Sequence, residues 1–178
     1  MSRTFRIDLN AHINTAIEAM GAGMDRKFGE FIPIKEPSLN LGSGEKKFSW
    51  ATPLQLPEWD GEHNKIPRSD ESMESIVAFH FFEHLTPARL PFILSECARV
   101  LRSGGTLTSV VPHRLGAIAF QDPDHKAFFT EDTWRTLMSN TYYKTKASGL
   151  SIPLNINMNI IFGESEKNLC LFTQFVRA

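Results

Sequence analysis

The chain has 178 residues, of which 42% are hydrophobic and 22% are charged, and its formal net charge is −1. This length fits one domain with a core of its own, and the balanced charge excludes the broad basic surface that sequence-independent nucleic-acid binding requires. Because no apolar run is long enough to span a bilayer and residues 1–6 lack the core of a secretion signal, we expect a cytoplasmic protein with neither a membrane nor a nucleic-acid partner.

The first predicted element is an amphipathic helix over residues 10–22, where apolar side chains recur at helical spacing until Gly21 and Gly23. A mixed segment with two prolines then leads into the first strand. We therefore divide the chain into an N-terminal helical extension, residues 1–34, and a single core domain, residues 35–178.

The first strand ends in a glycine turn, Gly42-Ser43-Gly44, which follows the apolar run Leu39-Asn40-Leu41. Glycine lacks a Cβ and adopts positive φ, so this turn offers bare N–H groups and room for a nucleoside-sized ligand at the carboxyl end of a strand. A plain strand-to-loop turn explains the same pattern. No helix of normal length fits between the turn and a short strand-like piece at residues 52–56, so the first crossover helix is reduced or absent.

From residue 75 onward, the sequence pattern predicts strands that alternate with helices, followed by a hairpin. Thr86 and Pro87 fit an N-cap and first helical position, and apolar residues recur at helical spacing from there to Gly104-Gly105. Thr130 fits the N-cap of a second helix, whose first turn carries two acids. The other predicted elements are strands at residues 75–82 and 106–112, the helix at 130–138, and a hairpin of strands at 154–162 and 168–176.

This order of elements indicates an α/β fold with a Rossmann-like, doubly wound, mostly parallel sheet and an antiparallel C-terminal hairpin. Ligands of such sheets bind at the carboxyl ends of the strands, which selects the glycine turn, Gln55, residues 80–84 and Pro112-His113. Cys97 and Cys170 lie in apolar stretches without metal-type spacing, which predicts buried free thiols in a reducing compartment.

Several motifs in the right order resemble the class I S-adenosylmethionine-dependent methyltransferases, in particular the compact branch called methyltransferase type 11. The resemblance covers about residues 38 to 135, and it depends on order and spacing, since no single motif is decisive. The matching segments are Leu39 to Gly44, Lys65 to Ile76, Phe79-His80-Phe81-Phe82-Glu83-His84-Leu85, Glu96 to Gly105, and Asp122-Pro123-Asp124-His125-Lys126 with Phe128-Phe129-Thr130.

The resemblance implies S-adenosylmethionine as cofactor and in-line methyl transfer from its sulfonium. Gly42 and Gly44 would admit the backbone against the cofactor, with Asn40 and Ser43 as further hydrogen-bonding candidates. The family usually places an acid at the end of the second strand for the ribose hydroxyls, and this chain has Gln55 there. A neutral hydrogen bond is roughly half as strong as a charge-assisted one, so we expect weaker cofactor binding.

The resemblance also suggests how the adenine is held. Asp60, next to Trp59, is the candidate acceptor for its amino group. Glu58 is the alternative if the register differs.

Histidines supply the remaining site candidates. His80 fits either the lining of the cofactor pocket or a hydrogen-bonded core position, and His113 and His125 are candidate general bases in loops after strand ends. His80-Phe81-Phe82-Glu83-His84 also matches an inverted zinc-protease signature. That signature needs both histidines on one helical face, and a strand would point them apart, so we predict no metal site.

The predicted function is methyl transfer to a small-molecule or glycan-like acceptor. The chain lacks both the Asn/Asp-Pro-Pro-Tyr sequence and the Pro-Cys pair of DNA base methyltransferases. Gln55 and the reduced crossover helix keep two alternatives open: a methyltransferase-like binding module without catalysis, and an enzyme that cleaves S-adenosylmethionine. The acceptor and the oligomeric state, a homo-oligomer included, are left open by the sequence.

Overall fold

The computed structural model describes residues 30–44, 48–139, 149–163 and 165–178, so the helix predicted at residues 10–22 lies outside the described residues. At its centre is a six-stranded sheet with the order β2-β1-β3-β4-β6-β5. Strands β1 to β4 run parallel, whereas β6 runs antiparallel to both of its neighbours, β4 and β5. The strands are β1 (Ser38–Leu41), β2 (Thr52–Leu54), β3 (Met73–Phe79), β4 (Leu101–Pro112), β5 (Leu154–Phe162) and β6 (Cys170–Arg177). The predicted α/β sheet with its closing hairpin is confirmed.

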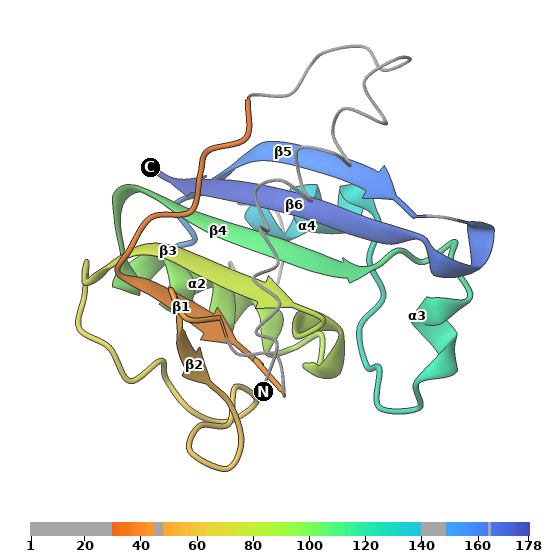
Figure 1. Cartoon of the computed structure of the whole chain (residues 1–178), viewed down its shortest axis with the longest axis horizontal. Helices are drawn as coiled ribbons and strands as arrows, with labels where there is room; N and C mark the ends of the chain where they lie inside the picture. The colour runs from red at the N-terminus through yellow and green to blue at the C-terminus, as the bar shows by residue number, and fades with distance from the viewer. Residues whose placement is uncertain (1–29, 45–47, 140–148, 164) are drawn as a thin grey trace, which may run out of the picture.

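Two helices, α2 (Leu90–Val100) and α4 (Glu131–Met138), lie behind the sheet in the view of Figure 1. The short helix α3 (Ile118–Gln121) and the 3₁₀ turns η1 (Phe82–His84) and η2 (Glu166–Asn168) complete the described helical elements. The opposite face of β6 is covered by the segment that precedes β1, because Ile32 exchanges two backbone hydrogen bonds with the Gln174 side chain, each 2.9 Å long. None of the described helices is long and apolar enough to cross a membrane.

Helix α4 begins as its sequence predicts and anchors the core. Thr130 is its N-cap, and its hydroxyl accepts from the N–H of Thr133 while the Thr133 hydroxyl accepts from the N–H of Thr130. From the next turn the fully buried ring of Trp134 packs between Phe129 and Phe175, with ring centroids 4.6 and 5.3 Å away. The aromatic core therefore ties the loop before α4 to the C-terminal strand.

The long loop between β2 and β3 is held against α2 by a partly buried ion pair. Glu96 accepts two hydrogen bonds of 2.8 Å from Arg99 and one of 3.0 Å from the backbone N–H of Ile66. The same guanidinium donates to the Asp70 carboxylate and to the carbonyls of Ile66 and Arg68. Glu96 is 6% exposed, so these bonds replace the water that its carboxylate loses on folding. We call this pair the Glu96–Arg99 clamp.

Acid should weaken the fold through the clamp. Hydrogen bonds from Arg99, and its charge, hold the pKa of Glu96 below its ordinary value. The resulting stabilisation is present above the unfolded-state pKa of about 4.3 and is lost as pH falls through the lower, folded-state pKa. In urea unfolding at decreasing pH, the wild type should lose stability more steeply than Glu96→Gln, which cannot titrate. Equal pH dependence of the two proteins would contradict this assignment.

The structure corrects both ends of the helix predicted from Thr86 to Gly104-Gly105. Thr86 does not cap α2, because its N–H and hydroxyl donate to the Glu62 carboxylate at 2.9 and 2.5 Å, and the helix starts at Leu90. The helix ends at Val100, and the next residue already pairs with β3, so the two glycines lie within β4. Contacts from distant segments therefore override the local capping signals.

The strand predicted at residues 75–82 is also shorter than expected. Strand β3 ends at Phe79, and His80 has a φ of +54°, a conformation that is uncommon outside glycine. The backbone N–H of His80 still donates to the carbonyl of Val110 in β4 at 2.8 Å. Directly after it the chain forms η1. The residues that follow His80 therefore leave the sheet at the carboxyl end of β3.

Candidate functional site

The glycine turn lies at the carboxyl end of β1, as predicted, and both of its glycines have positive φ, +63° at Gly42 and +50° at Gly44. Their surroundings differ. A Cβ on Gly42 would lie 2.6 Å from Cδ2 of Phe81, whereas a Cβ on Gly44 would meet no atom of the described residues within 4 Å. Gly42 is thus required by packing, and Gly44 faces the open space that a bound ligand needs.

Two residues predicted to bind the cofactor, Ser43 and Gln55, are connected by a hydrogen bond. The Ser43 hydroxyl donates to Oε1 of Gln55 at 2.8 Å, so the turn is connected to the end of β2. Asn40 and Ser43 are both buried, and Gln55 is half-buried. The side-chain oxygen of Gln55 is therefore used within the protein. Its side-chain NH₂ group can donate hydrogen bonds to a hydroxyl of a ligand.

Asp60, the predicted partner of the adenine amino group, uses its carboxylate within its own loop. Oδ1 accepts from the N–H of Glu62, and Oδ2 pairs with Nδ1 of His63, both at 2.8 Å. The bond with His63 is the main cause that lowers the pKa of Asp60. Between this loop and the glycine turn lie the stacked rings of Trp59 and Phe81, with centroids 5.7 Å apart. Phe81, which packs against Gly42, was not singled out from the sequence.

A cavity of about 470 Å³ lies beside the carboxyl end of β3. We call it the histidine cavity, because three imidazoles line it. Two of these histidines, His80 and His125, were predicted as site residues, and the fold brings them together although they are far apart in the sequence. The lining residues are His80, His84, Ile118, Gln121, Asp122, Pro123 and His125.

His80 lines this cavity with a side chain that is 44% exposed, and hydrogen bonds hold it there. Its Nδ1 donates to Oε1 of Glu83 at 3.0 Å, and Glu83 is 1% exposed. Hydrogen bonds to Cys170 and to Glu83 raise the pKa of His80 to about 9, against the opposing effect of burial. Cys170 itself is a free, buried thiol, as is Cys97, which confirms the prediction for both cysteines.

His125 and His113, the two predicted bases, have different environments. Nδ1 of His125 donates to the carbonyl of Ala119 at 2.9 Å, so its Nε2 carries the lone pair. His113 is 2% exposed and lies outside the histidine cavity. Its Nε2 donates to Glu131 at 3.2 Å, and its Nδ1 accepts from the N–H of Leu115. The catalytic role predicted for each of them stays a prediction.

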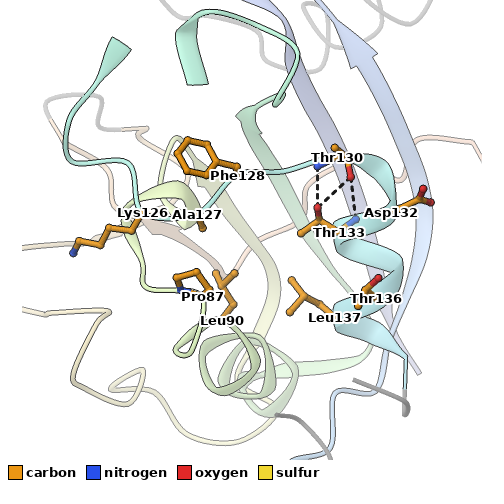
Figure 2. A pocket seen from close by; sticks show the side chains of 10 residues that line it. All are labelled: Pro87, Leu90, Lys126, Ala127, Phe128, Thr130, Asp132, Thr133, Thr136 and Leu137. Atoms are coloured by element: carbon orange, nitrogen blue, oxygen red, sulfur yellow. Dashed lines mark hydrogen bonds between the residues drawn. The ribbon is translucent and has the colours of Figure 1, made fainter. Parts of the chain in front are cut away.

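A second cavity, of about 450 Å³, lies between the start of α2 and α4 (Figure 2). Figure 2 shows apolar side chains around it, among them Leu90 and Leu137, together with the hydrogen-bonded Thr130 and Thr133 of the helix cap. It shares no lining residue with the histidine cavity, and neither cavity is lined by the glycine turn. Lys126, Asp132 and Thr136 also line this cavity, so it has polar groups besides those of the helix cap.

Comparison with known proteins finds a family model that matches part of the chain. A family model described as a methyltransferase domain matches residues 41–109, which run from the glycine turn through η1 and α2 into β4. No curated protein matches the sequence. Because the matched domain contains the turn with its open face at Gly44, the match indicates S-adenosylmethionine as the cofactor.

Solved structures with similar folds include three that align with more than nine tenths of the chain. One comes from the complex of the Haloferax volcanii Trm112 methyltransferase activator and the putative methyltransferase, with 13% identity, coverage of 94% of this chain and 91% of that one, and a TM-score of 0.56. The YcgJ protein of Bacillus subtilis has 11% identity, coverage of 93% and 98%, and a TM-score of 0.53. A protein studied for conversion of a disulfide bond into a thioacetal group during echinomycin biosynthesis has 13% identity, coverage of 93% and 80%, and a TM-score of 0.61. Residues 41–109 therefore match a methyltransferase-domain family, and the described chain has a methyltransferase-like α/β fold.

Proposed function

We propose that the protein transfers a methyl group from S-adenosylmethionine to a small-molecule or glycan-like acceptor that binds in the histidine cavity. The observation that carries this proposal is the relation between cavity and turn. His80 lines the cavity, and the next residue, Phe81, packs directly on Gly42 of the glycine turn. A cofactor at the turn and an acceptor in the cavity would therefore be separated by little more than one residue of chain.

The chain's own residues would hold the cofactor through the turn and the end of β2. Gly44 leaves its face open among the described residues, and Gln55 has amide donors for a ribose hydroxyl, whereas the N–H of Gly42 already donates to the carbonyl of Leu54. When bound, the sulfonium supplies an already activated methyl group. The protein then mainly has to align the acceptor with the methyl group and exclude water. His125, whose Nε2 carries the lone pair, is the residue in the cavity best placed to take a proton from an acceptor hydroxyl.

Gly44→Val tests the cofactor site, and Gly104→Val is its matched control. Both glycines have positive φ, +50° and +76°, and within the described part of the chain a Cβ at either one meets no atom within 4 Å. The backbone strain, about 1–2 kcal/mol, should therefore be similar in the two variants. In isothermal titration with S-adenosylhomocysteine, Gly44→Val should bind at least about tenfold more weakly than wild type, about 1.4 kcal/mol. Gly104→Val should bind like wild type.

Two results would count against the proposal. Wild-type protein that fails to bind either S-adenosylmethionine or S-adenosylhomocysteine at millimolar concentration would refute it. Equal binding by the Gly44 variant and wild type would place the cofactor elsewhere.

Product analysis separates methyl transfer from the two alternatives. Methyl transfer yields S-adenosylhomocysteine only when an acceptor is added. An enzyme that cleaves the cofactor would produce methylthioadenosine from protein and S-adenosylmethionine alone. A binding module would retain the cofactor unchanged with every member of a broad acceptor panel.

A further inference from the structure

Three side chains of the types that bind metal ions lie close together beside the histidine cavity, which two of them, His84 and His125, line. The methyl-transfer proposal leaves them unexplained as a group. Glu83 and His84 come from η1, and His125 comes from the loop that follows α3. One ligand atom of each residue lies within 4.8 Å of the ligand atoms of the other two. The rings of His84 and His125 are close, with centroids 4.9 Å apart. Two imidazoles and a carboxylate form a donor set that transition-metal ions use in proteins.

The backbone holds these two segments together without any ligand. The carbonyl of Glu83 accepts hydrogen bonds from the N–H groups of Lys126 and Ala127, at 2.7 and 3.0 Å. These bonds fix the residues that follow His125 directly against η1. The cluster therefore depends on main-chain contacts between the two segments, and its side chains need only torsional changes to converge on an ion.

His125 is oriented as a metal ligand would be. Its Nδ1 donates to the carbonyl of Ala119, which fixes the tautomer and leaves the Nε2 lone pair free to bind an ion. Metal-binding histidines are almost always held in this way, with the second ring nitrogen on a carbonyl or carboxylate. Oδ2 of Asp122 lies 3.9 Å from this Nε2 and adds negative charge to the cluster.

Glu83 provides an independent observation. Its side chain is 1% exposed, and among the described residues its Oε2 has no hydrogen-bond partner. An unsatisfied buried carboxylate oxygen is unfavourable, so such atoms usually have a partner. Oε1 is held by His80 at 3.0 Å, as ligating carboxylates commonly are. A cation would give the second oxygen its missing partner.

We propose that Glu83, His84 and His125 form a site for one divalent transition-metal ion, such as Zn²⁺ or Co²⁺. The two imidazoles favour such an ion over Mg²⁺ or Ca²⁺, which prefer oxygen ligands. The site uses two residues of the His80-Phe81-Phe82-Glu83-His84 signature together with a histidine from elsewhere in the chain, and His80 supports Glu83 instead of binding the ion. With the ion bound, His125 is a ligand and no longer a base.

Cobalt and zinc titrations of chelator-treated protein test this site without any cofactor or acceptor, so the result is independent of the methyl-transfer proposal. We expect one Co²⁺ per chain, detected by its visible ligand-field absorption and displaced by Zn²⁺. The variants His84→Ala and His125→Ala should each bind Zn²⁺ at least tenfold more weakly in isothermal titration, and Glu83→Gln should do the same. His63→Ala is the control, because this exposed histidine lies outside the cluster, and it should bind like wild type.

The variants of the two histidines keep the test informative if the buried Glu83→Gln change prevents folding, which circular dichroism will show. Wild-type protein without a Co²⁺ spectrum at millimolar metal would overturn the proposal. Undiminished Zn²⁺ binding by both His84→Ala and His125→Ala would overturn it too, because the ion would then bind elsewhere.

Discussion

Replacing Arg99 by Met should lower the free energy of unfolding by about 3 kcal/mol, the lower end of the range for breaking a buried ion pair, because the Arg99 side chain is 27% exposed. The loss comes mainly from Glu96, whose side chain is 8% exposed and whose two oxygens each accept a bond from Arg99. Without the guanidinium, a buried carboxylate is left with one backbone donor, the N–H of Ile66. The loop before β3 also loses the three hydrogen bonds that Arg99 donates to it.

Urea unfolding of three variants separates charge burial from the loss of a side chain. Arg135→Met removes an exposed pair, in which Arg135 is 57% and Asp132 is 83% exposed, and should change stability by less than about 1 kcal/mol. The double variant Glu96→Gln with Arg99→Met should recover part of the loss, because the amide carries no charge. If Arg99→Met were no more destabilising than Arg135→Met, the Glu96–Arg99 clamp would have no structural importance.

Gly42→Ala should destabilise the fold by about 2–4 kcal/mol, whereas Gly44→Ala should lower its stability by about 1–2 kcal/mol. Both changes place a Cβ at positive φ, but only at Gly42 does it lie 2.6 Å from the Phe81 ring. That ring is 8% exposed and stacked on Trp59, so it has little room to move. Chemical denaturation of both variants measures the difference between their free energies of unfolding. This difference is the cost of the clash between the new methyl group and the Phe81 ring.

A second substitution checks that Phe81 is the cause. Phe81→Leu removes the ring, so the combination Gly42→Ala with Phe81→Leu should be less destabilised than the sum of the two single variants. Strict additivity would show that the ring does not oppose the new methyl group. Substitution of Gly42 therefore tests packing against Phe81, and substitution of Gly44 tests cofactor binding.

Local signals were sufficient for several elements. The alternating apolar residues at 154–162 predicted β5 with the bounds that the structure shows, and Thr130 with its following acids predicted the start of α4. Local signals failed where a distant residue competes. Thr86 is a good N-cap by residue type, but Glu62 takes its hydroxyl and N–H, and no pattern near Thr86 contains that information.

The site shows the same division. Sequence patterns identified the glycine turn, Gln55, His80 and His125, and the family resemblance gave them a cofactor. They did not indicate that Phe81 covers Gly42, or that Asp60 uses both carboxylate oxygens in its own loop. A signal for the metal cluster was present in the Glu83-His84 pair. Its third member, His125, belongs to a loop that only the folded chain brings to η1.

The amino-acid sequence by itself determined the α/β class, the succession of elements along the chain, the closing hairpin and the turn at the end of β1, because these follow from local periodicity and from the backbone freedom of glycine. Tertiary structure alone decided which polar side chains share a cavity. His113 and His125 look alike in the sequence, since each follows a strand end. Glu131 and the N–H of Leu115 occupy both ring nitrogens of one, while Ala119 leaves Nε2 of the other free beside His84. Which atoms a side chain faces depends on contacts between distant segments, and no local pattern encodes them.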